Sequence, residues 1–132
     1  MKSDARGFTL IELMVTVSIV AILTAIAIPT YEAYRKRGYE AVAISYLRSW
    51  ATAQELYLQI NGDYASADED LAQSGIGVLY VPTNVPYSFQ IDSSGGTETW
   101  HGQAIPQTSG LSYMYVDQTG VVRRNMGGPV SP

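Results

Sequence analysis

The sequence predicts an α+β protein in which one long N-terminal helix packs, by its C-terminal half, against an antiparallel sheet of three or four strands. Three patterns support this prediction. A nearly continuous apolar run covers residues 8–28, a helical pattern of apolar residues continues from Thr30 to about Ile60, and short alternating segments separated by turn residues follow. With 132 residues, the chain has room for one globular domain beside this helix and little more.

The apolar run at residues 8–28 has the length of a membrane span. As a helix, its 21 residues cover about 30 Å, the thickness of a bilayer hydrocarbon core. The apolar region of a secretory signal peptide is shorter, about 7–15 residues, and ends at a small-residue cleavage site. No Ala-x-Ala site is followed by a clear mature start here, and the best cleavage site is Gly7, before the run.

One carboxylate, Glu12, lies near the start of this run. A charge inside an apolar span costs about 2.5–3.5 kcal/mol at mid-membrane and less near the interface. Glu12 either extends to the headgroups at the positive end of the helix, or pairs with another charge. Cleavage after Gly7 frees the amine of Phe8, and the Phe8 amine of a neighbouring copy would be such a partner in a low-dielectric filament core.

The segment Gly7-Phe8-Thr9-Leu10-Ile11-Glu12-Leu13-Met14, continuing to Pro29, resembles the N-terminal signal of type IV prepilins and type II secretion pseudopilins. The combination is specific, because it joins a short charged leader, a Gly-Phe junction, a Glu at a fixed offset, an apolar run and a Pro. The resemblance covers roughly residues 1–60 and, beyond them, only the layout. It implies a pilin-like fold.

The resemblance also implies a role for each of these residues. A prepilin peptidase cuts between Gly7 and Phe8 on the cytoplasmic face and N-methylates Phe8. Glu12 serves assembly by pairing with the Phe8 amine of an adjacent subunit. Pro29 is the helix bend, where the helix loosens when subunits leave the membrane, because Pro removes one helical hydrogen bond and clashes with the preceding turn.

Beyond the apolar run, apolar side chains recur at three- and four-residue steps and form one face of the helix. We expect this face to pack against the head, chiefly through Tyr39, Tyr46, Trp50 and Tyr57; its other members are Val42, Ala43, Leu47, Ala53 and Ile60. Asn61-Gly62 predicts the helix end, which gives a helix of about 53 residues. Aromatic residues at helical spacing are far more often core than a path for electrons.

Residues 35–37 form a basic cluster at the far end of the apolar run. The cluster is a solvated stripe or an anchor to lipid headgroups, or it pairs with acidic residues such as Glu32 or Glu40 of neighbouring copies. Against Lys2 and Arg6 of the leader, its three cations alone would place the C-terminal side in the cytoplasm. The resemblance implies the opposite orientation.

The remaining sequence predicts a small head. A capping box at residues 66–69 starts a short helix that ends by Gly75. Alternating or apolar segments then suggest strands at residues 78–81, 87–91, 97–105, 111–115 and 121–124, with turns at 93–96 and 117–120. Three or four of these strands would pair with their apolar face on the helix, and the tail at 127–132 would be loose.

No catalytic, cofactor-binding or metal site emerges, and we expect no enzyme. The chain has no cysteine, and His101, its only histidine, has no carboxylates at ligand or catalytic spacing. Residues 68–70 are acidic but lack the spacing of a calcium loop. The net charge is −4, and removal of residues 1–7, with two cations and one anion, changes it to −5. Such a balance argues against broad binding to nucleic acid.

The expected organisation is a leader at residues 1–7, a transmembrane or filament-core segment at 8–30, and an amphipathic helix with its sheet head at 31–132. The resemblance implies a precursor that spans the inner membrane once and a mature form in an extracellular pilus. The implied partners are further copies of the chain, the prepilin peptidase and the inner-membrane assembly machinery.

Two alternatives stay open at this point. A type II secretion pseudopilin shares every N-terminal feature; the C-terminal cysteine pair of many type IV pilins and the C-terminal calcium loop of major pseudopilins are both missing from the sequence. A single-span membrane protein with a soluble binding domain predicts an uncut N-terminus. Pilus roles implied by the resemblance are adhesion, motility and DNA uptake, among which the sequence does not choose.

Overall fold

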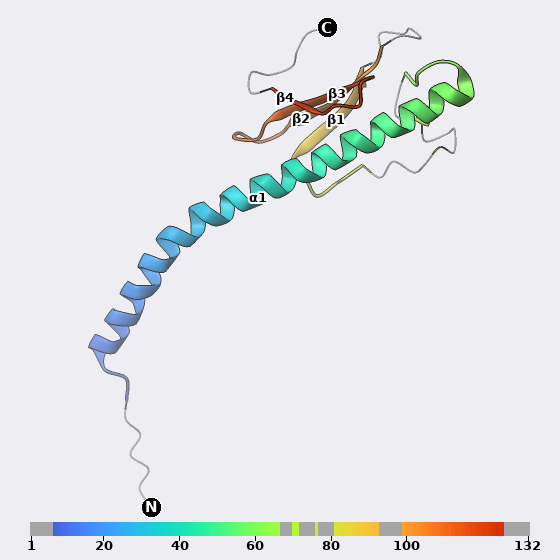
Figure 1. The fold of residues 1–132 in the computed structure, drawn as a ribbon. Helices are drawn as coiled ribbons and strands as arrows, with labels where there is room; N and C mark the ends of the chain where they lie inside the picture. Colours follow the sequence, from blue (N-terminus) through green and yellow to red (C-terminus); the bar gives the residue numbers. More distant parts are fainter. Residues whose placement is uncertain (1–6, 67–69, 72–75, 77–80, 93–98, 126–132) are drawn as a thin grey trace, which may run out of the picture. The chain divides into compact units, whose positions relative to one another are not determined.

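The computed structural model describes residues 7–66, 70–71, 76, 81–92 and 99–125 (Figure 1). The predicted capping box, the apolar run at 78–81, the turn at 93–96 and the tail at 127–132 lie wholly or mostly outside these residues. The chain divides into two compact units, Met1–Arg35 and Lys36–Pro132, which are described separately below.

The described residues form one long helix and four strands. Helix α1 extends over Leu10–Asn61, and the strands are β1 (Tyr87–Asp92), β2 (His101–Pro106), β3 (Tyr113–Asp117) and β4 (Arg123–Asn125). The strands form one antiparallel sheet in the order β1-β2-β3-β4, so each strand pairs with its neighbour in sequence. This arrangement confirms the predicted α+β fold.

Helix α1 has 52 residues and ends where the sequence predicts. Gly62 follows the last helical residue with φ 85°, a left-handed conformation that suits glycine. Its backbone N–H donates to the Leu58 carbonyl at 2.9 Å, which satisfies one of the last carbonyls of the helix. The Asn61-Gly62 pair therefore acts as the predicted C-terminal stop.

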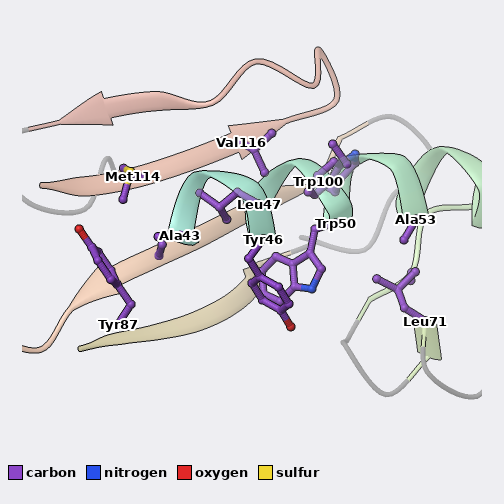
Figure 2. Packing of buried hydrophobic residues seen from close by; sticks show 13 residues of the cluster. Ala43, Tyr46, Leu47, Trp50, Ala53, Leu71, Tyr87, Trp100, Met114 and Val116 are labelled. Carbon is purple, nitrogen blue, oxygen red and sulfur yellow. The ribbon is translucent and has the colours of Figure 1, made fainter. Parts of the chain in front are cut away.

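The core of the unit Lys36–Pro132 lies between one face of α1 and one face of the sheet (Figure 2). Trp50 is fully buried, and its ring lies 5.1 Å from that of Tyr46 and 6.2 Å from that of Phe89. Tyr46 and Phe89 meet edge to face at 4.5 Å, a favourable geometry for aromatic pairs. The buried cluster comprises Ala43, Tyr46, Leu47, Trp50, Ala51, Ala53, Ala65, Leu71, Tyr87, Trp100, Ala104, Met114 and Val116.

The face of β3 that meets α1 is formed by the residues that alternate with its tyrosines. Met114 and Val116, both fully buried, belong to the core cluster with Ala104 of β2. The alternating residues Tyr113 and Tyr115 project from the other side of the pleat, with ring centroids 6.4 Å apart. The predicted alternation thus located the strand, and the structure shows that Met114 and Val116 form its inward face.

A buried amide fastens the segment after α1 to the helix. Gln54 is fully buried; its side chain donates to the Ala65 carbonyl at 3.0 Å and accepts from the Ala65 N–H at 2.9 Å. Both polar ends of the amide are therefore satisfied, which burial requires. The helical pattern had not identified Gln54, since a polar residue does not contribute to an apolar stripe.

A second polar contact ties α1 to the far edge of the sheet. The Glu40 carboxylate accepts a hydrogen bond from the Ser112 N–H at 3.2 Å and lies 3.4 Å from the Arg124 guanidinium of β4. Burial and the charge of Glu40, opposed by Arg124, raise the pKa of Tyr87 to about 12. The protonated Tyr87 hydroxyl donates to the Ser112 carbonyl at 3.0 Å. Glu40 is thus engaged within its own chain.

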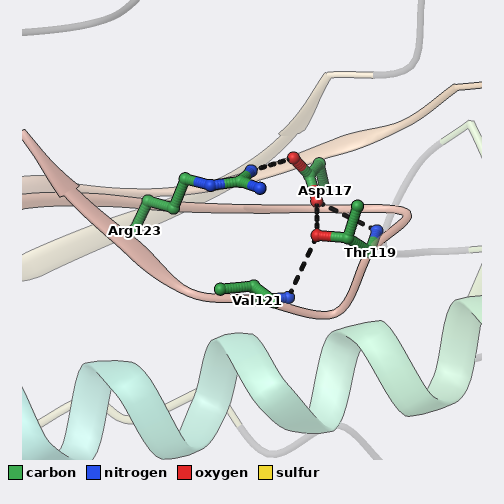
Figure 3. Close-up of polar contacts among 4 residues, drawn as sticks. All are labelled: Asp117, Thr119, Val121 and Arg123. Atoms are coloured by element: carbon green, nitrogen blue, oxygen red, sulfur yellow. Dashed lines mark hydrogen bonds and ion pairs between the residues drawn. The ribbon is translucent and has the colours of Figure 1, made fainter.

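The turn between β3 and β4 is organised by Asp117 (Figure 3). Its carboxylate accepts from the Thr119 N–H at 2.9 Å and contacts the Thr119 hydroxyl and the Arg123 guanidinium. Gly120, with φ 69°, donates to the Asp117 carbonyl at 2.9 Å. Partial burial raises the pKa of Asp117, but the bonds from Thr119 and Arg123 outweigh it and hold the pKa below its usual value.

Asp117→Asn should destabilise the unit Lys36–Pro132 in a pH-dependent way. Because the folded-state pKa is depressed, the carboxylate stabilises the fold above its unfolded pKa of about 3.9, and this contribution is lost as the pH falls through the lower folded value. Thermal unfolding in detergent should therefore show a lower midpoint for the variant at pH 7 and a shrinking difference below about pH 4. Asp63→Asn, at an exposed carboxylate, is the control; a pH-independent difference would contradict the assignment.

Candidate functional site

The helical segment in the unit Met1–Arg35 exposes an apolar surface on all sides. Every described residue of this unit is exposed, from 80% for Phe8 to 53% for Ile19 among the large apolar side chains. The others are Leu10, Ile11, Leu13, Met14, Val15, Val17, Val20, Ile22, Leu23, Ile26, Ile28, Tyr31 and Tyr34. A surface of this kind requires a cover of lipid or protein, since soluble monomers rarely expose large contiguous apolar patches.

The few polar side chains inside the apolar segment satisfy their hydrogen bonds within the helix. The hydroxyl of Thr16 donates to the Leu13 carbonyl at 2.8 Å, and that of Ser18 donates to the Met14 carbonyl at 2.7 Å. Thr24 and Thr30 donate in the same way to carbonyls one turn earlier. These hydroxyls can therefore enter an apolar environment without losing a hydrogen-bond partner.

Helix α1 also contains a stretch that is long and apolar enough to cross a membrane, and none of it is buried within the structure. Pro29 lies inside the helix, directly after this stretch. Its ring nitrogen has no hydrogen to donate to the preceding turn, so the helix is intrinsically weaker there. The hydroxyl of the next residue, Thr30, bonds the Ile26 carbonyl at 2.9 Å.

Thr9 and Glu12 form a capping box at the start of α1. The Glu12 carboxylate accepts from the Thr9 backbone N–H at 2.9 Å and from the Thr9 hydroxyl at 2.7 Å. In return, the Glu12 backbone N–H donates to the Thr9 hydroxyl oxygen at 3.3 Å. The reciprocal bonds satisfy two N–H groups that a helix start leaves free. They also hold the carboxylate next to Phe8 of its own chain.

The carboxylate borders a shallow surface depression at the first turns of α1. Its lining residues are Phe8, Ile11, Glu12, Val15 and Thr16. Gly7 and Phe8 precede the helix and are exposed, so the Gly7–Phe8 peptide bond is accessible. The structure thus brings three of the sequence-predicted site residues, Gly7, Phe8 and Glu12, into one short accessible stretch.

The four residues expected to pack the head differ in burial. Tyr46 is 6% exposed and Trp50 is fully buried, while Tyr39 and Tyr57 are half-buried at the margin of the core. Val42 and Ile60, also assigned to the apolar face, are 41% and 65% exposed and do not belong to the core cluster. No group of three His, Cys, Asp or Glu side chains that would hold a metal occurs in the part of the chain that the structure describes.

Comparison with known proteins relates the sequence of this chain to pilus proteins. Residues 2–28 match the family described as "Prokaryotic N-terminal methylation motif". The chain is 40% identical to "Type IV wide pilus major component PilA4" of Thermus thermophilus, over 64% of this chain and 63% of that protein. It is 35% identical to "Type IV major fimbrial protein FimA" of Dichelobacter nodosus, over 61% and 65%. The N-terminal stretch therefore carries this methylation motif, and the chain is similar to type IV pilins.

A third relative of this chain is "Prepilin peptidase-dependent protein D" of Escherichia coli, with 34% identity over 74% of this chain and 64% of that protein. The chain spans less than two thirds of the length of these three relatives. The motif match covers the stretch that contains Gly7, Phe8 and Glu12.

Thr9 was not predicted as the partner of Glu12. The signal was present, because a Ser or Thr followed three residues later by Glu is the pattern of a capping box. Thr9-Leu10-Ile11-Glu12 has this spacing. Because the segment lies in an apolar run, Glu12 was interpreted as a charge within a membrane span and not as part of a helix cap. The internal partners of Glu40 were missed for a different reason, since Ser112 and Arg124 are far away in sequence.

Proposed function

We propose that this chain is a structural subunit of a type IV pilus, assembled by packing of its N-terminal helical segments. The observation that carries the proposal is the apolar segment of α1, which is exposed at every described residue. The methylation motif matched by residues 2–28 and the similarity to relatives named as pilus and fimbrial components support it. The role requires no catalysis by this chain, and we assign no catalytic residue.

The same segment serves two environments in turn. Before assembly, residues 8–30 cross the inner membrane, with residues 1–7 as a leader on the cytoplasmic side. After assembly at the cell surface, the segments of many copies cover each other. Burial of apolar area contributes about 25 cal/mol per Å² relative to water, so segments that leave the bilayer must pack together. Residues 31–132 then form the remainder of the helix and the head.

Maturation frees the group that pairs with Glu12. A prepilin peptidase cuts the accessible Gly7–Phe8 bond and methylates the new Phe8 amine, which remains a cation. In the filament, the Glu12 carboxylate of one copy neutralises the Phe8 amine of an adjacent copy. Buried ion pairs often add little net stability, so this pair mainly fixes the register of the subunits.

Before Glu12 pairs with the Phe8 amine of an adjacent copy, the capping box gives its carboxylate a partner within the chain. In the single chain, Thr9 supplies two hydrogen bonds to the carboxylate at 2.9 and 2.7 Å, which lowers the cost of placing a charge at the membrane boundary. Pro29 marks the site at which α1 loosens as the subunit leaves the bilayer. The inner-membrane pilus assembly machinery is the expected partner in that step. Type II secretion is not favoured, because the relatives are named for pili and fimbriae.

Mass spectrometry of filaments sheared from cells that express this chain tests the proposal. We expect an N-terminal peptide that begins with N-methyl-Phe8 and no peptide from residues 1–7. Gly7→Glu, which blocks close approach of a peptidase to the junction, should leave the precursor in the membrane fraction without filaments. Surface material that retains residues 1–7 would rule out the proposed maturation.

A further inference from the structure

The unit Lys36–Pro132 has opposite charges at its two ends. At the end where α1 enters the unit, Lys36 and Arg37 lie on exposed turns of the helix. The Lys36 ammonium lies over the loop after β2, where a methyl group on Gly110 would be 2.6 Å from it. Arg124 of β4 joins them, since it reaches Glu40, one helical turn beyond Lys36.

This basic end keeps an excess of positive charge. Glu40 is its one described carboxylate, and this side chain is already bonded to the Ser112 N–H and paired with Arg124. The Arg124 side chain is nevertheless 55% exposed. Among the described side chains of this end, three cations therefore stand against one anion; the cations are Lys36, Arg37 and Arg124.

The other end of the helix is acidic. Glu55 is exposed on the last turns of α1, and the Tyr64 hydroxyl donates to one of its oxygens at 3.2 Å. Asp63 is exposed just beyond the helix end. Because Gln54 fastens Ala65 to the helix through two hydrogen bonds, this segment is held against the end of α1. The carboxylates are thus presented from a fixed surface.

The two ends are too far apart to satisfy each other within one chain. Arg37 and Glu55 are separated by 18 residues of α1, about five turns and about 27 Å, so they lie on the same side of the helix. The Debye length at physiological ionic strength is about 8 Å, so their mutual attraction is screened. Charges arranged in this way are complementary between copies that follow one another along the helix direction.

We propose that the basic end of one copy, formed by Lys36, Arg37 and Arg124, docks on the acidic end of another copy, formed by Glu55 and Asp63. The inference rests on the proposed function, in which the N-terminal segments of many copies pack together in a filament. A contact between two different surfaces of the same chain is heterologous and propagates without closing, as a filament requires. Opposite charges at these surfaces favour this polarity and register and disfavour others.

Charge reversal in cells that assemble the chain tests the contact. Lys36→Glu with Arg37→Glu makes both ends acidic, and Glu55→Lys with Asp63→Lys makes both ends basic. Each pair of changes should reduce the yield of sheared filaments by about tenfold or more, because like charges then meet. The combined fourfold variant restores complementarity with the signs exchanged and should recover most of the yield.

The control is Arg48→Glu, a single charge reversal at an exposed position of α1 between the two ends. It should leave the yield within about twofold. Equal damage by Arg48→Glu, or a fourfold variant as defective as its parents, would overturn the docking proposal. The proposal would also be overturned if Lys36→Glu with Arg37→Glu depleted the chain from the membrane fraction and the fourfold variant did not restore it. That result would mean that these cations anchor the chain to lipid headgroups. Absence of filaments from the unaltered chain would instead reject the proposed function itself.

Discussion

Glu12→Ala is expected to leave the chain inserted in the membrane and its head folded, while filaments disappear. The exposed apolar segment still provides the span, and the head lies in a separate compact unit. Loss of one partner from a buried, hydrogen-bonded charge pair costs about 2–5 kcal/mol, which corresponds to roughly 30-fold to several thousand-fold in association. Electron microscopy and the filament yield after shearing measure the effect, and membrane fractionation checks insertion.

Glu12→Gln separates the two roles of this side chain. An amide oxygen can still accept from the Thr9 N–H, so the capping box at the start of α1 persists, but the charge is lost. If pairing with the Phe8 amine drives assembly, Glu12→Gln should fail as completely as Glu12→Ala. Filaments from Glu12→Gln at normal yield would mean that Glu12 acts through the helix cap alone.

Thr9→Ala completes this set of variants, because it removes the hydroxyl and keeps the charge. Loss of an N-cap side chain costs about 1 kcal/mol of helix stability. Amide exchange in the first turn of α1 should therefore be faster in detergent than in the unaltered chain or in Thr9→Ser. Assembly should be reduced far less than in Glu12→Ala. A full loss of filaments from Thr9→Ala would mean that the cap, and not the charge of Glu12, controls assembly.

The local parts of this fold were accessible from the sequence. The end of α1 was predicted because Asn61-Gly62 supplies the left-handed stop that the helix needs, and Gly62 has that conformation. β1 and β3 were found from alternation over five or six residues. Roles for Gly7, Phe8 and Glu12 could be predicted because all of their chemistry lies within a few residues, and these roles stay predictions.

The parts that failed depend on contacts between distant segments. Alternation in β3 cannot say which side of the pleat meets the helix, and in the structure it is the side of Met114 and Val116. The decision lies in β2, where Gly102 and Ala104 are small enough to let the helix approach the sheet. Gln54 was missed because its partner, Ala65, lies 11 residues away in a segment without regular structure.

The close approach at Gly102 makes Trp50→Ala the most damaging change expected in the head. Trp50 is fully buried between Tyr46, Phe89 and β2. Its truncation to Ala removes a large aromatic side chain from a closed site, which costs about 3–5 kcal/mol. Denaturant titration in detergent, followed by the fluorescence of the remaining Trp100, should show a lower midpoint, and limited proteolysis should cut the head faster.

A double-mutant cycle with Gly102→Ala tests whether this contact is the cause. A methyl group on Gly102 would lie 2.8 Å from the Trp50 ring, so Gly102→Ala alone should cost about 1–3 kcal/mol by overpacking. With Ala at position 50 the nearest obstruction is gone, and the same change should cost clearly less, with a coupling of about 0.5–3 kcal/mol. Val121→Ala, at a side chain that is 53% exposed, should stay within about 0.5 kcal/mol of the unaltered chain. Additive effects of the two core changes would show that Trp50 does not pack on β2, and the face of α1 assigned to the sheet would then be wrong.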